Sequence, residues 1–170
     1  MRRCLRPSSR SAKIAPTEDP DWEPPPWLYL DASALIKLYL PEPDSEAMER
    51  ALLGRQDILV SDLAVTEAVS SFARRLREGT VERATAAHLS RTLVSHLDED
   101  RYIRVELDRT THRRAEQLLL VSPGVLRASD ALHIALALSA SAGALVTFDT
   151  RLAAAAQALG LATSAPESGR

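Results

Sequence analysis

The sequence predicts an α/β fold: a three-layer sandwich with a central, mainly parallel sheet of four to five short strands flanked by helices. Short apolar runs alternate with longer helix-like segments, and this alternation is typical of strand–helix–strand units in a parallel sheet. The chain has 170 residues, which is enough for one domain with a sizeable core. Only 4% of the residues are aromatic although 45% are hydrophobic, so the core must be built from Leu, Val, Ile and Ala.

The elements follow from apolar periodicity and from the residues that start and stop helices. Strands are predicted at Trp27–Leu30, Ile58–Val60, Tyr102–Leu107, Ala144–Phe148 and Leu161–Thr163. Helices are predicted at 32–40, 44–53, 62–78, 80–96, 110–120, 129–142 and 150–159. The segment 129–142 is apolar nearly all round, which predicts a buried helix.

Residues 1–26 differ from the rest of the chain, because they hold six of the ten prolines and almost no large apolar side chains. Such a segment cannot offset its ordering entropy by burial, so we predict a disordered, Pro-rich tail. The folded domain is predicted at 27–163, followed by a flexible C-terminus at 164–170.

Composition excludes several classes of protein. The single Cys4 rules out an intramolecular disulfide and a Cys-based zinc cluster. No apolar run approaches the roughly 20 residues needed to span a bilayer, and no apolar stretch follows Arg2 and Arg3 as it would in a secretory signal. We therefore expect a cytoplasmic protein without a membrane partner.

The net charge of −2 lacks the basic excess usual in nucleic-acid-binding domains. A nucleic-acid function would require acids concentrated in one site and basic residues around it. All 21 basic residues except Lys13 and Lys37 are Arg, which suits bidentate phosphate contacts.

Two acids, Asp31 and Asp149, directly follow predicted strands. If those strands are parallel, both carboxylates lie at the carboxyl edge of the sheet, where open α/β sheets bind ligands. Oxygen donors there suit Mg²⁺ or Mn²⁺ better than zinc. Each Asp also precedes a helix and could simply be its N-cap. Asp62 and Asp108 occupy similar positions, so position alone does not separate ligands from caps.

Asp130 opens the predicted buried helix, where an acid must either find a partner or carry a desolvation cost; metal ligation and helix capping are both open. Glu67 lies opposite the apolar stripe of its helix, beside Leu63, Ser70 and Arg74, and a solvated helix face is the plainer interpretation. The four histidines have no metal-binding spacing, and HExxH, CxxC, GxSxG and P-loop motifs are absent.

Four segments in this order resemble PIN-domain proteins, and in particular VapC-type toxins of bacterial toxin–antitoxin pairs. They are LYLDASAL at 28–35, SDLAVTE at 61–67, SDALH at 129–133 and TFD at 147–149. Each segment is weak alone, but four in the right order on suitable elements are specific. The resemblance covers roughly residues 27–163.

The resemblance implies a Mg²⁺- or Mn²⁺-dependent ribonuclease with catalytic, metal-binding acids at Asp31, Glu67, Asp130 and Asp149. It assigns supporting hydroxyls to Ser33 and Thr147, and no role to Asp62 or Asp108, which we interpret as caps or surface residues. Arg74, Arg127 and Arg151 are candidates for RNA binding. An antitoxin partner, seated near the helices at 62–78 and 80–96, and a homodimer are also implied.

Two alternatives remain at this point. A catalytically inactive PIN-like binding module would keep the fold without the chemistry. A haloacid-dehalogenase-like phosphatase also begins with an Asp after a strand, but it needs a second Asp two residues later. Here Asp31 is followed by Ala32 and Ser33, so this alternative ranks last.

Overall fold

The computed structural model describes residues 27–166, so the predicted tail at 1–26 and the last four residues lie outside the described part. The described chain forms one five-stranded sheet in the order β3-β2-β1-β4-β5, with every pairing parallel. The strands are β1 (Leu28–Leu30), β2 (Ile58–Ser61), β3 (Ile103–Val105), β4 (Ala144–Val146) and β5 (Thr163–Ser164). The predicted parallel sheet is confirmed.

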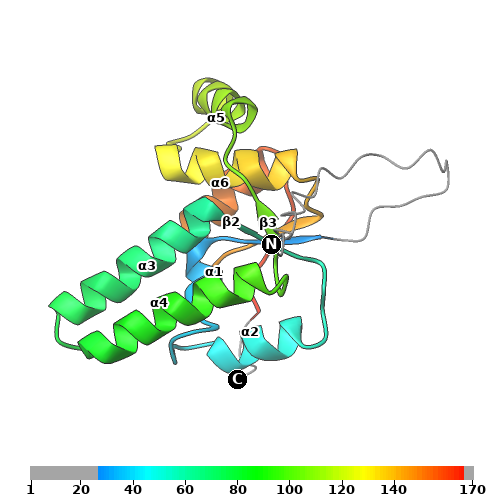
Figure 1. Ribbon diagram of the computed structural model, residues 1–170. Helices are drawn as coiled ribbons and strands as arrows, with labels where there is room; N and C mark the ends of the chain where they lie inside the picture. Colours follow the sequence, from blue (N-terminus) through cyan, green and yellow to red (C-terminus); the bar gives the residue numbers. More distant parts are fainter. Residues whose placement is uncertain (1–26, 167–170) are drawn as a thin grey trace, which may run out of the picture.

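Seven helices surround this sheet within residues 27–166: α1 (Ala32–Ile36), α2 (Ser45–Leu52), α3 (Asp62–Arg77), α4 (Arg83–Asp98), α5 (Arg109–Val121), α6 (Ala128–Ser139) and α7 (Thr150–Ala158). Helices α1 to α4 pack on one face, and α6 and α7 pack on the other. Figure 1 shows α5 lying on α6, and α3 and α4 running side by side as a long hairpin. The predicted three-layer sandwich is confirmed.

The inner strands β1, β2 and β4 have no exposed residue, because neighbouring residues point to opposite sides of the sheet and helices cover both sides. In β1, Leu30 contributes to the core under α1 to α4, whereas Tyr29 contributes to the core under α6 and α7. The same division holds for Val60 and Leu59 in β2. Short strands without a polar face are therefore the expected sequence pattern.

Several predicted boundaries were wrong for local reasons. The helix predicted from Thr80 begins at Arg83, because the Thr80 hydroxyl and amide both donate to the carbonyl of Arg75 and so close α3 instead of opening α4. The last strand includes Ser164, which pairs with Val146. The strand predicted at Leu161–Thr163 is thus observed at Thr163–Ser164.

The strand order places a reversal point between β1 and β4. From β1 the chain passes to β2 on one side, while β4 joins β1 on the other side. The carboxyl ends of strands at such a point form the usual ligand crevice of open α/β sheets. Asp31 follows β1 directly, and Asp149 follows β4 after two intervening residues. Among the described residues, no helix is long and apolar enough to cross a membrane.

Candidate active site

Asp31 is the most extensively hydrogen-bonded acid at the carboxyl edge of the sheet. It is the N-cap of α1 and accepts the Ala34 amide at 2.9 Å. The Ser33 hydroxyl lies 2.8 and 2.9 Å from its two oxygens, and the Thr147 hydroxyl donates to Oδ2 at 2.8 Å. Burial raises the pKa of Asp31, and the hydrogen bonds only partly oppose this effect. Asp31 is thus a helix cap that also carries a desolvated charge, and capping alone does not exclude ligation.

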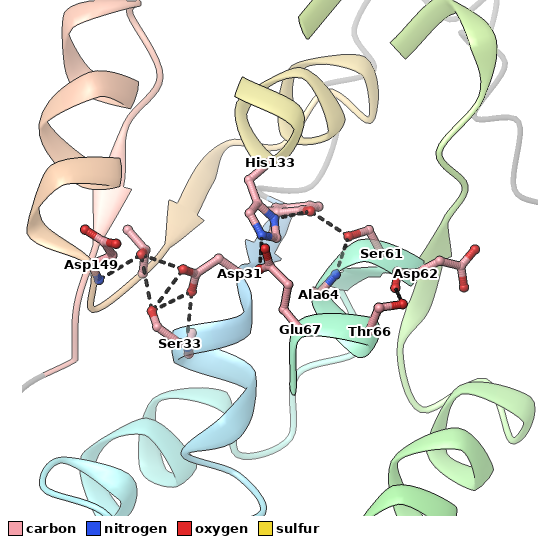
Figure 2. Close-up of polar contacts among 12 residues, drawn as sticks. Asp31, Ser33, Ser61, Asp62, Ala64, Thr66, Glu67, His133 and Asp149 are labelled. Carbon is pink, nitrogen blue, oxygen red and sulfur yellow. Dashed lines mark hydrogen bonds and ion pairs between the residues drawn. The ribbon is translucent and has the colours of Figure 1, made fainter. Parts of the chain in front are cut away.

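The hydroxyls of Ser33 and Thr147 join two distant parts of the chain. Ser33 Oγ accepts the Phe148 amide at 2.8 Å, and Thr147 Oγ1 accepts the Asp149 amide at 3.1 Å. Both hydroxyls also contact Asp31, as Figure 2 shows. The residues predicted as supporting hydroxyls therefore connect the end of β1 to the segment after β4.

Asp149 is the N-cap of α7 and accepts the amides of Arg151 at 2.8 Å and Leu152 at 3.3 Å. Burial alone would raise its pKa, but the two backbone N–H donors and the nearby charges of Arg151 and Arg127 outweigh burial and lower it. Asp149 is therefore held as a carboxylate, and its cap role leaves Oδ2 directed toward the Arg151 guanidinium at 3.7 Å.

Asp130 differs from the other acids because it makes no cap. It lies in the first turn of α6 and is 8% exposed, while the N-cap of that helix is Arg127. Within residues 27–166 its carboxylate has neither a hydrogen bond nor an ion pair, yet it lines a pocket with Asp31. A nearly buried acid that opens only to a pocket needs a partner there. Of the two interpretations, ligation is favoured over capping.

Glu67 projects from α3 toward α6, where its Oε2 lies 2.8 Å from His133 Nε2. His133 is 2% exposed, and its Nδ1 lies 2.9 Å from the Tyr29 hydroxyl. That hydroxyl lies 2.7 Å from Ser61 Oγ, which caps α3. The solvated helix face that periodicity favours holds only in part, because α3 is covered on one side by α1 and α4, while the 36% exposed side chain of Glu67 faces the pocket on the other.

The sequence interpretation missed His133. Its position three residues after Asp130 was a usable indication, because residues at this spacing are neighbours on one helix face. What the sequence could not show is that α3 and α6 approach each other, since α4, β3 and α5 lie between them in the chain. Figure 2 shows the side chains of His133 and Glu67 pointing toward each other.

A pocket of about 500 Å³ collects the four predicted acids, Asp31, Glu67, Asp130 and Asp149. Its wall also carries three guanidinium groups, those of Arg74, Arg77 and Arg127. Arg151, a predicted RNA contact, is outside the pocket lining and bonds to Asp149 instead. The pocket thus combines carboxylates at its base with cations that could meet an anionic ligand.

The predicted separation of Asp62 and Asp108 from this site is confirmed. Asp62 pairs with Arg104 at 2.7 Å on the surface and points away from Glu67 in Figure 2. Asp108 caps α5 by accepting the Thr111 amide at 2.8 Å. Neither residue lines the pocket.

The donors at the pocket match a hard divalent cation in chemical type, since all four are carboxylate oxygens. Among the described residues, however, no three acidic or histidine side chains stand close enough together to hold a metal ion. Glu67 is turned to His133 and Asp149 to its own helix. Four like charges repel each other and converge only around a cation, so the donor set fits a metal that would draw these side chains inward.

The fold and the acidic pocket define a PIN domain. A family model described as PIN domain matches residues 28–158, and the chain belongs to this family. It is 36% identical over 141 residues to Ribonuclease VapC46 of Mycobacterium tuberculosis, a match that covers 82% of this chain and 97% of the relative. It is 34% identical over 147 residues to Ribonuclease VapC35 of the same species, covering 84% and 99%.

Solved structures show the same fold. VapC20 of Mycobacterium tuberculosis, a Sarcin-Ricin loop cleaving toxin, aligns with a TM-score of 0.60 at 14% identity, covering 75% of this chain and 94% of that one. FitAB bound to a DNA fragment aligns with a TM-score of 0.65 at 19% identity, covering 84% and 97%. At these identities the likeness concerns the fold alone.

Proposed function

We propose that the protein is a Mg²⁺- or Mn²⁺-dependent endoribonuclease that hydrolyses RNA phosphodiester bonds as the toxin of a toxin–antitoxin pair. The carrying observation is that the pocket at the sheet reversal point brings together Asp31 and Asp130, two acids that are 4% and 8% exposed. Relatives named as VapC ribonucleases over most of the chain support the same activity. An enzyme acting on cellular RNA would work in the cytoplasm.

Asp31 and Asp130 would hold the metal, with Glu67 and Asp149 completing its surroundings. A divalent cation supplies an acidified water as nucleophile and stabilises charge on the phosphate. The protein's own contribution is to fix the carboxylates. Ser33 and Thr147 set the orientation of Asp31 by donating to it, and burial strengthens every electrostatic interaction inside the pocket.

Arg74 and Arg127 would bind the RNA backbone beside the acids. Both line the pocket, and among the described residues neither forms a salt bridge with an acid. Their guanidinium groups are therefore available to phosphate oxygens, which they can bind in bidentate fashion. Arg77 lies on the same wall and joins the candidates. Arg151 is the weaker candidate, because it is engaged with Asp149.

An antitoxin and a second copy of the chain are the proposed protein partners. The exposed apolar residues Leu120, Val121 and Val125 lie together at the end of α5 and in the following loop, with 87%, 67% and 97% exposure. Exposed apolar clusters of this kind mark interaction sites. We assign this cluster to the homodimer and the neighbourhood of α3 and α4 to the antitoxin.

A catalytically inactive binding module is the second candidate, because no three donors converge in the described chain. The deciding experiment incubates full-length protein with a structured RNA and Mg²⁺ or Mn²⁺. Asp31→Asn and Asp130→Asn should each lower cleavage by more than roughly 100-fold, since loss of a direct ligand exceeds the 10–100-fold cost of losing an outer-shell partner.

Asp62→Asn and Asp108→Asn are the matched controls, because each removes a carboxylate that lies outside the pocket. Both should cleave like the unmodified protein, and EDTA should stop all cleavage. Equal activity in all five proteins, or activity that survives EDTA, would show that the four-acid pocket is not the nuclease site.

A further inference from the structure

We propose that His133 is a positioning residue that fixes the carboxylate of Glu67 through a directed hydrogen-bond chain starting at the cap of α3. This inference rests on the assignment of Glu67 to the metal site in the proposed function. It adds a residue that the four acidic positions do not include, and it gives a role to a histidine that is almost fully buried.

The chain has four members: Ser61, Tyr29, His133 and Glu67, linked at 2.7, 2.9 and 2.8 Å. They come from β2, β1, α6 and α3, so the path crosses from the sheet to the helices that flank the pocket. Ser61 and Tyr29 are each 0% exposed. Buried polar groups must satisfy each other, so the positions of the hydrogens can be assigned.

The assignment starts at the two ends. An ionised Glu67 can only accept, so His133 Nε2 carries a hydrogen and donates it. Nδ1 of the neutral ring then accepts from the Tyr29 hydroxyl, and the Tyr29 oxygen accepts from Ser61. Ser61 Oγ in turn accepts the Ala64 amide at 3.1 Å as the cap of α3. Every donor and acceptor along the path is used once in a consistent direction.

The opposite direction leaves a group unsatisfied. If Nδ1 donated to Tyr29, the Tyr29 hydroxyl would either donate to Ser61 or accept a second hydrogen bond from it. In the first case the Ser61 hydrogen finds no acceptor in this chain, and in the second case the Tyr29 hydrogen finds none. A buried donor without a partner destabilises the fold. The chain is therefore directed toward Glu67, and α3 is tied to its own Glu67 through three intervening side chains.

As a consequence, the carboxylate of Glu67 is oriented by a hydrogen-bond chain that begins at Ser61, the N-cap of the same helix. A histidine fixed by a second hydrogen bond can present its other nitrogen in only one orientation. His133 thereby limits the rotamers of a carboxylate whose side chain is otherwise 36% exposed. A loss of this restraint should weaken cation binding without removing a ligand.

The first test needs neither metal nor RNA. Nitrogen-15 NMR of the histidine rings in the full-length protein should show His133 with its hydrogen on Nε2 and an unprotonated Nδ1, with His133→Gln providing the assignment. A ring protonated on Nδ1 overturns the inference. If this tautomer is found but the unmodified protein binds no Mn²⁺, the proposed function fails while the positioning contact stands.

The second test measures Mn²⁺ affinity by calorimetry. His133→Phe should weaken binding by roughly 10–100-fold, as expected for an outer-shell partner, and His133→Gln should recover part of the loss because its amide can donate to Glu67. In a Glu67→Gln background, His133→Phe should have no further effect. Unchanged affinity in His133→Phe, or an equal additional loss in that background, overturns the inference.

Tyr29→Phe supplies an independent variant if His133→Phe does not fold. Tyr39 offers its matched control, because its hydroxyl lies 2.7 Å from Nδ1 of His96 in the same type of contact, beside a different pocket. Tyr29→Phe should weaken Mn²⁺ binding several-fold, whereas Tyr39→Phe should leave it unchanged. Equal effects of the two variants contradict a specific path to Glu67.

Discussion

The hydroxyl of Thr147 donates to Oδ2 of Asp31 at 2.8 Å and so joins the loop after β4 to the end of β1. The Thr147 hydroxyl oxygen also accepts a hydrogen bond from the Asp149 amide at 3.1 Å. One side chain therefore fixes two of the four acids relative to each other. Neighbouring strands alone would not do this, because the loop that leaves β4 has no ladder partner at Asp149.

Replacing Thr147 with Val should keep the shape of the side chain and remove the hydroxyl's hydrogen bonds with Asp31, the Asp149 amide and Ser33. We expect RNA cleavage to fall by about 10–100-fold, because the hydroxyl acts on Asp31 as an outer-shell partner. The measurement is kcat and KM with a structured RNA. Thr147→Ser retains the hydroxyl and should retain most of the activity. An equal loss in the Ser variant would show that the hydroxyl alone does not explain the effect.

Asp31→Asn should raise the melting temperature of the metal-free protein by a few degrees while abolishing cleavage. Burial makes the ionised carboxylate of Asp31 costly, and an amide of the same shape does not carry this cost. Mg²⁺ should stabilise the unmodified protein by mass action, and much less so the variant. Calorimetric melting with and without Mg²⁺ checks both points. A lower melting temperature in the variant would show that the charge stabilises the fold.

Arg74→Ala and Arg127→Ala should weaken RNA binding with similar effects on all sequences. A phosphate contact contributes mainly through counterion release, so the slope of log K against log salt should fall by about 1 for each residue removed. Arg113→Ala is the control, because Arg113 pairs with Glu116 at 2.6 Å outside the pocket. If Arg113→Ala reduces the slope as strongly, the RNA contacts a broad basic surface.

The free energy of unfolding should depend on pH in the acid range, because the carboxylate of Asp108 caps α5. The hydrogen bond from the backbone amide of Thr111 is the main cause that lowers the pKa of Asp108 below the ordinary value of 3.8. A lowered carboxyl pKa stabilises the folded state above 3.8, and this contribution is lost as the pH falls through the folded-state value. Asp108→Ala should thus have a lower melting temperature than the unmodified protein at pH 7. The difference between the two melting temperatures should shrink as the pH falls toward 3. A constant difference would exclude an ionised cap.

The cluster of Leu120, Val121 and Val125 should control the oligomeric state. Leu120→Glu introduces a charge into an apolar interface and should convert a dimer into a monomer, as measured by light scattering across a concentration series. Leu53→Glu is the control, since Leu53 is 84% exposed but lies at the end of α2. A monomeric unmodified protein would contradict the assigned dimer surface.

The centre of the sheet was predictable because β1, β2 and β4 are short, mainly apolar runs closed by a turn or a helix start. The reversal between β1 and β4 was not predictable, because strand order depends on how the helices share the two faces. Asp31 and Asp149 were nominated by their position after strands, and the structure brings both to one pocket. Local patterns thus identify residues at a sheet edge, but they do not establish which of them meet.

Glu67 and His133 mark the limit of local patterns. Periodicity placed Glu67 on the polar side of its helix, and this is correct for α3 alone. The partner that changes its environment, α6, lies more than 60 residues further along the chain. Thr80 gave the reverse error, because a hydroxyl can close one helix as easily as it can open the next. Contacts across the fold decide such cases.

The parallel order β3-β2-β1-β4-β5 makes β1 the central strand, although it is the first to be synthesised. Until β4 is made, β1 has a partner on only one edge, and Asp31 has neither the Thr147 hydroxyl nor the neighbouring Asp149. The complete acidic pocket therefore cannot form until the chain has been synthesised past Asp149. If the protein cleaves RNA, as proposed, this order of assembly means that nearly the whole domain is synthesised before the nuclease site exists. The ribosome that makes the chain is therefore not exposed to an active site during most of synthesis.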